Sequence, residues 1–431
     1  MADGARSDHP GVQAQLDRLA RLSPGGDRLG LERIAELLAA LGDPQRHLPP
    51  VFHVAGTNGK GSTTAFLRAA LEAAGKRVHV FTSPHLVRFN ERIRLAGRLI
   101  DDASLAALLE EVLDVSGTIA PSFFEATAAA AFLAFARAPA DALVLEVGMG
   151  GRLDATNVVE RPVVTGIAAL GLDHQQWLGE TLAEIASEKA GIAKPGAPLV
   201  TLAHPPDAAA RIRELAEATG APLLVQGAQW HSHVAGARLH YRDGAGALDL
   251  PLPALPGLHQ ADNAALAVAM LRYQQAMAVP DEALARAMSE VRWPARLQKL
   301  RPGPLTGTRD IWLDGGHNAQ AAQVLARSIE ELANGRPLHL IAGALTTKDA
   351  AGLLAPFRGV AQQVSAISFA HPLAMRAEDL AGVGRTLGLP MTAKTDLRAA
   401  IAGAASDAII LIAGSLYLAG EVLALNGELP D

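Results

Sequence analysis

The amino-acid sequence predicts an α/β protein with two domains, each built on a mostly parallel sheet covered by helices. Short apolar runs rich in β-branched residues alternate with alanine-rich runs of helical periodicity. Continuous apolar strands separated by helices are typical of parallel sheets that are buried on both faces. A fresh strand–helix series begins after the segment 291–296, so we place a domain boundary near residue 298. We therefore expect a larger domain at 1–298 and a smaller one at 299–431.

The individual elements follow from the same alternation. The segment 233–253 differs, because it resembles antiparallel strands with a glycine-rich turn, and we expect a small antiparallel section near 230–253. The expected strands are 51–54, 78–82, 142–147, 163–168, 199–202, 223–225, 311–313, 338–341, 364–369 and 408–412. The expected helices include 31–41, 63–74, 103–113, 127–136 and 180–190.

Composition excludes several classes of function. The chain has 431 residues, of which 49% are hydrophobic and only 4% aromatic, so its cores must be built from Ala, Leu, Val and Ile. A net charge of -6 without a basic tract argues against a nucleic-acid partner. The absence of cysteine excludes disulfides, thiolate metal sites and a cysteine nucleophile. The longest apolar stretch, 408–420, is too short to span a bilayer, and no apolar signal core opens the chain, so we expect a cytoplasmic protein without a membrane partner.

A glycine-rich loop at 56–62 lies between the first expected strand and a helix. Its glycines let backbone N–H groups point at phosphate oxygens, and the helix N-terminus adds its positive dipole end. Lys60 would reach the β- and γ-phosphates, and a hydroxyl would help to hold Mg²⁺. The loop is a variant, because the common pattern has glycine where this chain has Val54 and a hydroxyl residue where it has Gly61. The loop predicts a P-loop ATPase-like first domain. The later strand–helix series predicts a smaller Rossmann-like second domain.

Three polar residues follow neighbouring strands: Ser83, Glu146 and His174. Each alone has an ordinary interpretation, as a turn serine, a core glutamate held by an arginine and a surface histidine. Ligands of α/β proteins bind at the carboxyl ends of strands, however, and a buried carboxylate is costly unless it is paired or bound to a metal. Together beside a phosphate loop they predict a metal site, and the excess of oxygen ligands favours Mg²⁺ over zinc.

Other candidate motifs are weaker. Lys189 ends a helix, where a lysine is usually a surface residue favoured by the helix dipole. His231 and His233 have strand spacing but no further partner in the sequence, so we interpret them as a solvent-exposed face. The segment 314–318 follows a strand and contains two glycines, which favours a second loop that faces a ligand.

Together these motifs resemble the folylpolyglutamate synthase/dihydrofolate synthase family, within the Mur ligase-like ATP-dependent amide ligases. They occur in the family order and span nearly the whole chain, and the 58–61 variant of the loop is itself typical of the family. The form of 152–157 is most similar to bifunctional bacterial members. The matching runs are 53–62, 82–93, 146–157, 172–174, 188–192, 293–297, 313–318 and 414–418.

The resemblance implies roles for individual residues. It implies catalytic roles for Lys60, His174 and Lys189, and Lys189 matches a lysine that family members carry as a carbamate. The implied nucleotide contacts are Thr57, Asn58, Gly59, Lys60, Gly61, Ser62, Asn263, Arg296, Asp314 and His317. The implied metal ligands are Ser83, Glu146 and His174, with Ser62 in a secondary role. The implied dihydropteroate contacts are Leu29, Gly30, Leu31, Ser122, Phe123, Phe124, Glu125, Leu153, Asp154 and Ala155.

The family reaction joins L-glutamate to a pteroate or folate carboxylate at the expense of ATP. The resemblance implies two Mg²⁺ ions, an acyl-phosphate intermediate, the substrates dihydropteroate and tetrahydrofolate, and a monomeric enzyme. Closure of the two domains, with 292–297 near the hinge, would keep water from the acyl phosphate.

Three alternatives stay open. One is a monofunctional folylpolyglutamate synthase. Another is a related muropeptide or cyanophycin-type ligase, against which the run 82–93 argues. The third is an ATP-driven switch or binding module, for which the set Glu146, His174 and Lys189 is more than is needed. The chain departs from the family pattern at 315–319 and 347–349, which leaves the contacts of the second domain with glutamate and phosphate less defined.

Overall fold

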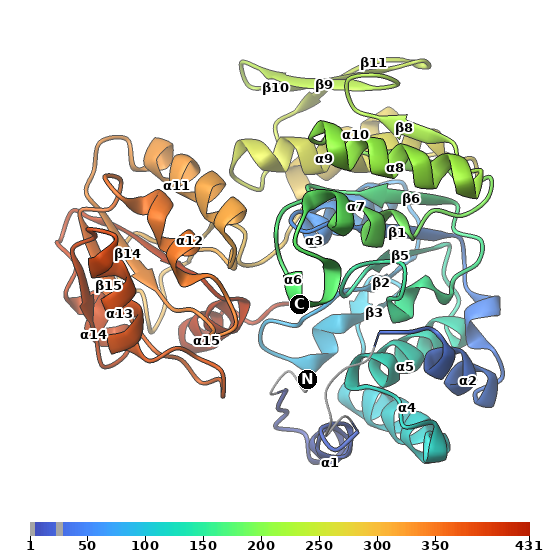
Figure 1. The fold of residues 1–431 in the computed structure, drawn as a ribbon, viewed down its shortest axis with the longest axis horizontal. Helices are drawn as coiled ribbons and strands as arrows, with labels where there is room; N and C mark the ends of the chain where they lie inside the picture. Colours follow the sequence, from blue (N-terminus) through green and yellow to red (C-terminus); the bar gives the residue numbers. More distant parts are fainter. Residues whose placement is uncertain (1–4, 23–28) are drawn as a thin grey trace. The chain divides into compact units, whose positions relative to one another are not determined.

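The computed structural model describes residues 5–22 and 29–431, which fall into two compact units. The first unit takes the described residues up to Ala254, then Gln260–Arg292 and Asp431. The second takes Leu255–His259 and Trp293–Pro430. Figure 1 shows the elements of both units along the chain.

The first unit is built on an eight-stranded sheet. Its strands are β1 (Val51–Ala55), β2 (Val78–Phe81), β3 (Ile93–Leu95), β4 (Arg98–Leu99), β5 (Ala142–Glu146), β6 (Val164–Ile167), β7 (Leu199–Thr201) and β8 (Leu223–Val225). They lie in the order β4-β3-β2-β5-β1-β6-β7-β8. Within this order, all neighbouring pairs in the run β2-β5-β1-β6-β7-β8 are parallel, whereas β3 is antiparallel to both of its neighbours. The parallel register brings the carboxyl ends of β1, β2, β5 and β6 to one edge of the sheet.

Helices cover both faces of this sheet. On one face, Met270 of α9 (Leu258–Tyr273) packs on Gly166 of β6, where its sulfur leaves no room for a Cβ. On the other face, Leu143 and Leu145 of β5 share a core cluster with Phe132 of α5 (Phe123–Arg137). The other helices of the unit are α1 (Pro10–Leu19), α2 (Glu32–Ala40), α3 (Lys60–Ala73), α4 (Asp102–Val115), α6 (Gln175–Leu178), α7 (Leu182–Ala190), α8 (Pro206–Thr219) and α10 (Asp281–Glu290).

A small antiparallel sheet also belongs to the first unit. It consists of β9 (His231–Ala235), β10 (Arg238–Asp243) and β11 (Gly246–Pro251), in the order β11-β10-β9. One face is apolar, and its buried Tyr241 stacks on Trp230 with ring centroids 5.9 Å apart. Arg272 of α9 donates two hydrogen bonds, of 2.6 and 2.8 Å, to Asp243, and so fixes the end of β10 to that helix.

The second unit has a six-stranded sheet in a smaller α/β arrangement. Its strands are β12 (Gln298–Lys299), β13 (Ile311–Leu313), β14 (Leu338–Ala342), β15 (Gln363–Ala366), β16 (Met391–Ala393) and β17 (Ile409–Ala413), in the order β12-β13-β17-β14-β15-β16. Only the edge pair β12–β13 is antiparallel in this described sheet. Its helices are α11 (Ala319–Ala333), α12 (Ala350–Leu354), α13 (Ala377–Thr386), α14 (Leu397–Ala402) and α15 (Leu416–Asn426).

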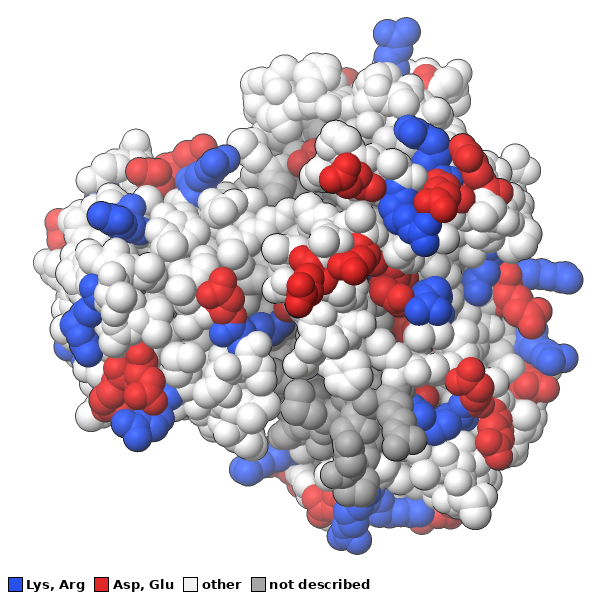
Figure 2. All heavy atoms as spheres, in the orientation of Figure 1, with Lys and Arg blue, Asp and Glu red and all other residues white. Residues whose placement is uncertain are grey.

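The predicted fold class is confirmed: two α/β sheets, the first larger and mostly parallel. On the face that Figure 2 shows, described basic and acidic side chains are interspersed rather than gathered by sign. Among the described residues, no helix has the length and apolar character needed to cross a membrane.

Candidate active site

The glycine-rich loop joins β1 to α3 at the carboxyl edge of the first sheet. The backbone N–H groups of Thr57 and Asn58 both donate to Ala169 O, at 2.9 and 3.0 Å, which anchors the loop beside β6. Gly59 has φ 86°, and a Cβ there would collide with the side-chain amide of Asn263. Glycine is therefore required by both the backbone conformation and the lack of space. The predicted Asn263 thus lies directly against the loop.

Lys60 is the first residue of α3 and folds back over the loop. Its ammonium donates to Gly56 O at 3.0 Å and to Thr57 O at 3.3 Å. The next two predicted residues, Gly61 and Ser62, are in the first turn of the helix, where backbone N–H groups have no partner within the helix. A positive side chain and a helix N-terminus at one loop are suited to binding a polyanion.

Glu146 and Ser83 meet at the ends of adjacent strands. Glu146 ends β5 in register with Val54 of β1, and only 5% of it is exposed. The backbone N–H of Ser83 donates to Glu146 Oε2 at 3.3 Å. A buried carboxylate therefore stands beside a serine and within one strand of the phosphate-binding loop.

His174 occupies a different environment. It lies just beyond β6 with φ 53°, a left-handed conformation, and its side chain is 44% exposed. Its Nε2 is 3.9 Å from a carboxylate oxygen of Asp173. The structure therefore leaves the His174 ring accessible from solvent while Glu146 is covered.

Lys189 is almost fully buried near the end of α7. Burial, the largest effect, and the nearby charge of Lys60 lower the pKa of its amine from 10.5 to about 7. The carboxylates of Asp173 and Asp154 oppose this change. The side chain thus lies within electrostatic range of the phosphate-binding loop, and much of its amine is neutral at neutral pH. Sequence alone had favoured a surface residue here.

The predicted pteroate contacts gather at one corner of the first unit. Leu31, Phe123, Phe124 and Ala155 belong to one hydrophobic cluster. The residues 122–125 start α5 as a capping box, in which Glu125 accepts from Ser122 N at 2.6 Å. Arg33, which the sequence reasoning missed, pairs with the same carboxylate at 3.0 Å. Of the other predicted contacts, Leu29, Gly30 and Leu153 are described at half-buried positions.

Asp154 holds the loop that follows β5. Its carboxylate accepts from Met149 N at 2.8 Å, Thr156 N at 3.0 Å and Thr156 Oγ1 at 2.5 Å. Burial raises the pKa of this carboxyl, and the three donors oppose the shift. Asp154 is therefore committed to organising the loop of residues 148–157.

A buried histidine continues this chain of hydrogen bonds. The Nε2 atom of His53 lies 2.9 Å from Thr156 Oγ1. Because the single hydroxyl proton of Thr156 goes to Asp154, His53 must donate from Nε2, and its buried, unpartnered Nδ1 must carry the lone pair. Burial lowers the pKa of His53 to about 3, in keeping with a neutral ring. Sequence pattern gave no signal for this link, since His53 lies inside an apolar strand.

In the second unit, the predicted residues lie around one loop after β13. Asp314 accepts from Leu297 N at 2.8 Å and from Gly316 N at 2.6 Å. A Cβ on Gly315 would come within 2.9 Å of an Arg296 nitrogen, and the His317 ring lies 3.0 Å from Gly315 O. His259, a residue not singled out from sequence, is within electrostatic range of Asp314 and Arg296, and burial lowers its pKa.

The donor set fits a hard cation. Among the residues that the structure describes, no three His, Asp or Glu side chains form a ready-made metal site. Ser62, Ser83 and Glu146 instead offer hydroxyl and carboxylate oxygens close to a loop suited to phosphate. Mg²⁺ is usually bound by one or two carboxylates together with water and substrate phosphate oxygens, rather than by an all-protein cage.

Comparison with known proteins places this site in a family. The model of the Mur ligase middle domain matches residues 54–271, and that of the dihydrofolate synthetase C-terminal domain matches residues 304–425. A dihydrofolate synthase/folylpolyglutamate synthase of Bacillus subtilis is 35% identical over 419 residues, which cover 92% of this chain and 95% of the relative.

Solved structures agree over nearly the whole chain. E. coli FolC in complex with DHPP and ADP has a TM-score of 0.88 and 33% identity, covering 96% of this chain and 97% of that chain. A bifunctional folylpolyglutamate synthase/dihydrofolate synthase with Mn, AMPPNP and L-glutamate bound has a TM-score of 0.84 and 32% identity, with the same coverage. The chain therefore belongs to the dihydrofolate synthase/folylpolyglutamate synthase family of Mur-type ligases.

Proposed function

We propose that this protein is an ATP-dependent ligase that forms an amide between L-glutamate and the carboxylate of dihydropteroate, giving dihydrofolate. The same site extends the glutamate tail of tetrahydrofolates. The observation that carries the proposal is the Gly59–Lys60 loop beside the Glu146–Ser83 pair, in a chain with 35% identity to a relative named for both activities. The form of 152–157 also favours a bifunctional enzyme.

The chemistry requires activation of the carboxylate, because oxide is too poor a leaving group for an amine to displace. The substrate carboxylate attacks the γ-phosphorus of ATP, and the bond to the β,γ-bridging oxygen breaks, giving an acyl phosphate and ADP. The glutamate amine then attacks the acyl carbon, inorganic phosphate leaves, and the ammonium proton passes to solvent or a base. Both steps depend on positioning and on neutralising phosphoryl charge.

Lys60 and the loop supply part of that neutralisation. We assign Thr57 through Ser62 to the triphosphate, with the ammonium of Lys60 near the transferred phosphoryl group. Asn263 of the same unit would also border the bound nucleotide, because its side chain lies against Gly59. From the second unit we assign Arg296, Asp314 and His317 to nucleotide contacts. Bound ADP and AMPPNP in the related structures support nucleotide binding.

The divalent cation would be Mg²⁺, held by Glu146, Ser83 and His174, with Ser62 as a further oxygen donor. When bound, the ion supplies charge neutralisation for the transferring phosphoryl group. The manganese in a related structure supports a divalent ion. We infer two ions, because two are expected from the family resemblance.

Lys189 is proposed to carry a carbamate. A neutral amine can add carbon dioxide, forming an N–C bond and releasing one proton, whereas an ammonium cannot. The pKa of about 7 leaves a substantial neutral fraction at neutral pH. The product, a carbamate close to Lys60, is an anionic oxygen donor. It adds negative charge to a site that has few carboxylates.

The pteroate is proposed to lie at the corner formed by Leu29–Leu31, Ser122–Glu125 and Leu153–Ala155. Phe124 contributes aromatic surface there, since its ring crowds Gly148 and lies 6.0 Å from the ring of Phe81. An aromatic and apolar corner beside a rigid loop suits a flat heterocycle.

The proposal is tested by mass spectrometry of the products. ATP, Mg²⁺ and L-glutamate are supplied with dihydropteroate in one reaction and with tetrahydrofolate in another. Products heavier by a glutamyl residue in both reactions are expected, whereas product from tetrahydrofolate alone would make the enzyme monofunctional. Release of ADP at the same rate without pteroate or glutamate would instead indicate an ATP-driven switch.

We also infer that the ligase acts as a monomer in the cytoplasm on small molecules only, without nucleic acid or membrane partners. Sedimentation at assay concentration checks it, and a dimer would contradict it.

A further inference from the structure

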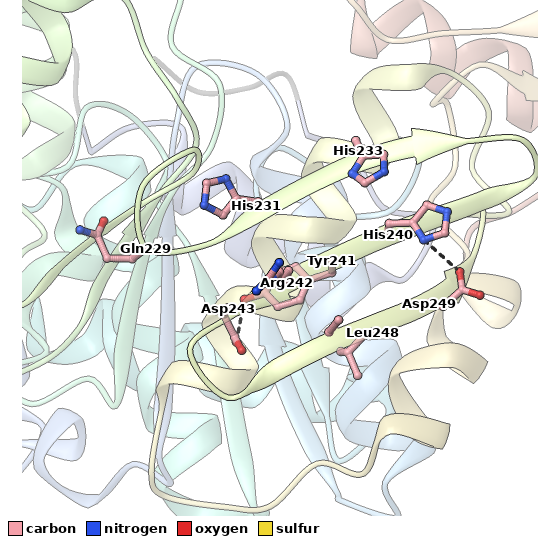
Figure 3. Close-up of a pocket in the computed structure, with 10 residues that line it drawn as sticks. Gln229, His231, His233, His240, Tyr241, Arg242, Asp243, Leu248 and Asp249 are labelled. Atoms are coloured by element: carbon pink, nitrogen blue, oxygen red, sulfur yellow. Dashed lines mark hydrogen bonds and ion pairs between the residues drawn. The ribbon is translucent and has the colours of Figure 1, made fainter.

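The exposed face of the three-stranded sheet carries a row of polar side chains in register. His233 of β9 pairs with His240 of β10, which pairs in turn with Asp249 of β11. Because side chains alternate along a strand, all three point away from the apolar face that contains Tyr241. Figure 3 shows them along the wall of an open cavity of about 780 Å³. The sequence alone had offered His233 no partner.

The two imidazoles lie close together. Their ring centroids are 5.0 Å apart and their planes differ by 20°. Directly opposed residues of an antiparallel pair have Cβ atoms roughly 4.5–5.5 Å apart, so the backbone holds the two rings within reach of one ion. The nearly parallel ring planes keep the in-plane nitrogen lone pairs from converging, so both side chains must turn about χ1 and χ2. Such a turn brings two nitrogens to the separation of about 3.3 Å that bonds of ~2.0–2.1 Å to a tetrahedral ion require.

Asp249 orients one of the rings. Its Oδ1 is 3.4 Å from Nδ1 of His240, as Figure 3 also marks. A proton shared at Nδ1 leaves the lone pair on Nε2 available to a metal. Carboxylate, imidazole and metal in series is the arrangement that fixes the tautomer and the orientation of most metal-binding histidines.

We propose that His233 and His240 form a second cation site, selective for a divalent transition metal such as Zn²⁺ or Ni²⁺ and distinct from the Mg²⁺ site. His240 binds through Nε2, His233 through a ring nitrogen, and water completes the coordination. Imidazole favours these ions over Mg²⁺, whose ligands are oxygens. The site has two protein ligands, and the described residues contain no group of three or more such side chains that could hold a metal.

Two neighbouring arginines lower the expected affinity of this site for a cation. Arg238 donates to the same Asp249 oxygen from Nε at 3.0 Å, and Arg242 lies two residues beyond His240 on the same face, opposite His231. Asp249 offsets only one of these two positive charges. Both arginines are exposed, so water and salt screen their repulsion of a bound cation. Replacing Arg238 with glutamine is accordingly expected to tighten metal binding by roughly threefold at low salt.

The test is calorimetric titration of the untagged full-length enzyme with Ni²⁺ in excess Mg²⁺. H233Q and H240Q are each expected to weaken Ni²⁺ binding at least tenfold, and D249N by about tenfold, in the range found for residues that orient a ligand. Paramagnetic broadening of the ring-proton resonances of His233 and His240 locates the ion independently. H47Q removes another exposed histidine of the same unit and is expected to leave the affinity unchanged.

Ligase activity separates this site from the catalytic one. Turnover in H233Q and H240Q with Mg²⁺ and ATP is expected to match that of the unmodified enzyme. Equal Ni²⁺ affinity in H233Q, H240Q and the parent would overturn the proposal, as would broadening confined to other histidines. Because the variants leave Lys60 and Glu146 in place, a negative outcome here bears only on this face and not on the proposed ligase.

Discussion

Lys60 lies both in the first turn of a helix and at the edge of a glycine-rich loop. Its ammonium is bonded to loop carbonyls at 3.0 and 3.3 Å, so the charge is already held where phosphate is expected. Replacing it with alanine is expected to lower kcat by at least roughly 100-fold, because a charge that stabilises the transition state is lost. ADP release is the measurement, and the melting temperature reports the fold.

Lys76→Ala provides the control for that variant, since it removes a surface lysine just beyond the same helix. Normal turnover in Lys60→Ala would contradict the assignment of the loop to the triphosphate.

Lys189 is a residue whose burial makes stability depend on pH. Its folded-state pKa of about 7 lies below the ordinary 10.5, so between these values the unfolded chain binds more protons than the folded one. The penalty of burying a charge is therefore complete below about pH 7 and is relieved as pH rises toward 10.5. Lys189→Met is expected to raise the melting temperature by at least about 2 °C near pH 6, and by less near pH 9, in buffer free of carbon dioxide. An equal gain at both pH values would contradict this.

The carbamate gives Lys189 a second, separable readout. Lys189→Ala is expected to lose ligation and to recover part of it with acetate, whose carboxylate can occupy the space of the missing anion. Full activity without any additive would remove the carbamate assignment.

The link from His53 to Asp154 through Thr156 concerns residues that support the pteroate corner. Thr156→Val removes the hydroxyl, which leaves the His53 N–H buried without a partner at a cost of about 1–3 kcal/mol. Asp154 keeps its two backbone donors but loses the hydroxyl, which should loosen the loop of residues 148–157 and raise KM for dihydropteroate more than it lowers kcat. Thr156→Ser keeps the hydroxyl and should restore KM, and ¹⁵N chemical shifts of His53 should show the Nε2–H tautomer. A merely structural loss would lower stability without the selective change in KM.

At the level of elements, the strand–loop–helix unit of β1 and α3 is the part most constrained by geometry. Gly59 has φ 86° and no room for a Cβ, whereas Gly75 near the end of the same helix has φ 76° and open space around it. Both substitutions to alanine strain the backbone by roughly 1–2 kcal/mol. Only Gly59→Ala also displaces Asn263, so it is expected to weaken ATP binding tenfold or more, while Gly75→Ala lowers stability with unchanged affinity. Equal ATP affinities in calorimetric titration would show that the loop tolerates the displacement.

Most elements were predictable from sequence, because long apolar strands such as β1 and β14 carry an unmistakable pattern. The short strands β3, β4, β12 and β16 were not predicted, because none is an uninterrupted apolar run, unlike the equally short β8 and β13. The helices α3 and α5 begin earlier than expected, at Lys60 and Phe123, because the first turn of a helix is defined by capping rather than by periodicity.

The residues of the candidate site were likewise predictable only in part. Residues in contiguous motifs, such as the phosphate-binding loop, were recognisable from sequence. The burial of Lys189, the pairing of Arg33 with Glu125 and the partner of His233 depend on tertiary neighbours far apart in the chain. No local pattern contains that information.

At the scale of the whole molecule, two units with separate cores are expected to unfold separately. One apolar cluster, which contains Phe132, belongs to the first unit, and another, which contains Leu340, belongs to the second. Calorimetry should therefore show two transitions, and Mg²⁺–ADP at 100 times its Kd should stabilise the transition of the unit that holds the Gly59–Lys60 loop by about 2.7 kcal/mol. Lys60→Ala should reduce that shift. A single transition with calorimetric and van't Hoff enthalpies in agreement would contradict independent unfolding.

The hydrogen bonds from Lys60 to Gly56 and Thr57 have a consequence for product release. Phosphate that reaches the loop exchanges partners with carbonyls that already solvate the ammonium, so the net gain is the difference between two sets of bonds. When ADP departs, the lysine returns to these carbonyls and is not left unsolvated. A resting state of this kind lowers the barrier to emptying the site, and so favours rapid successive turnovers over tight retention of the spent nucleotide.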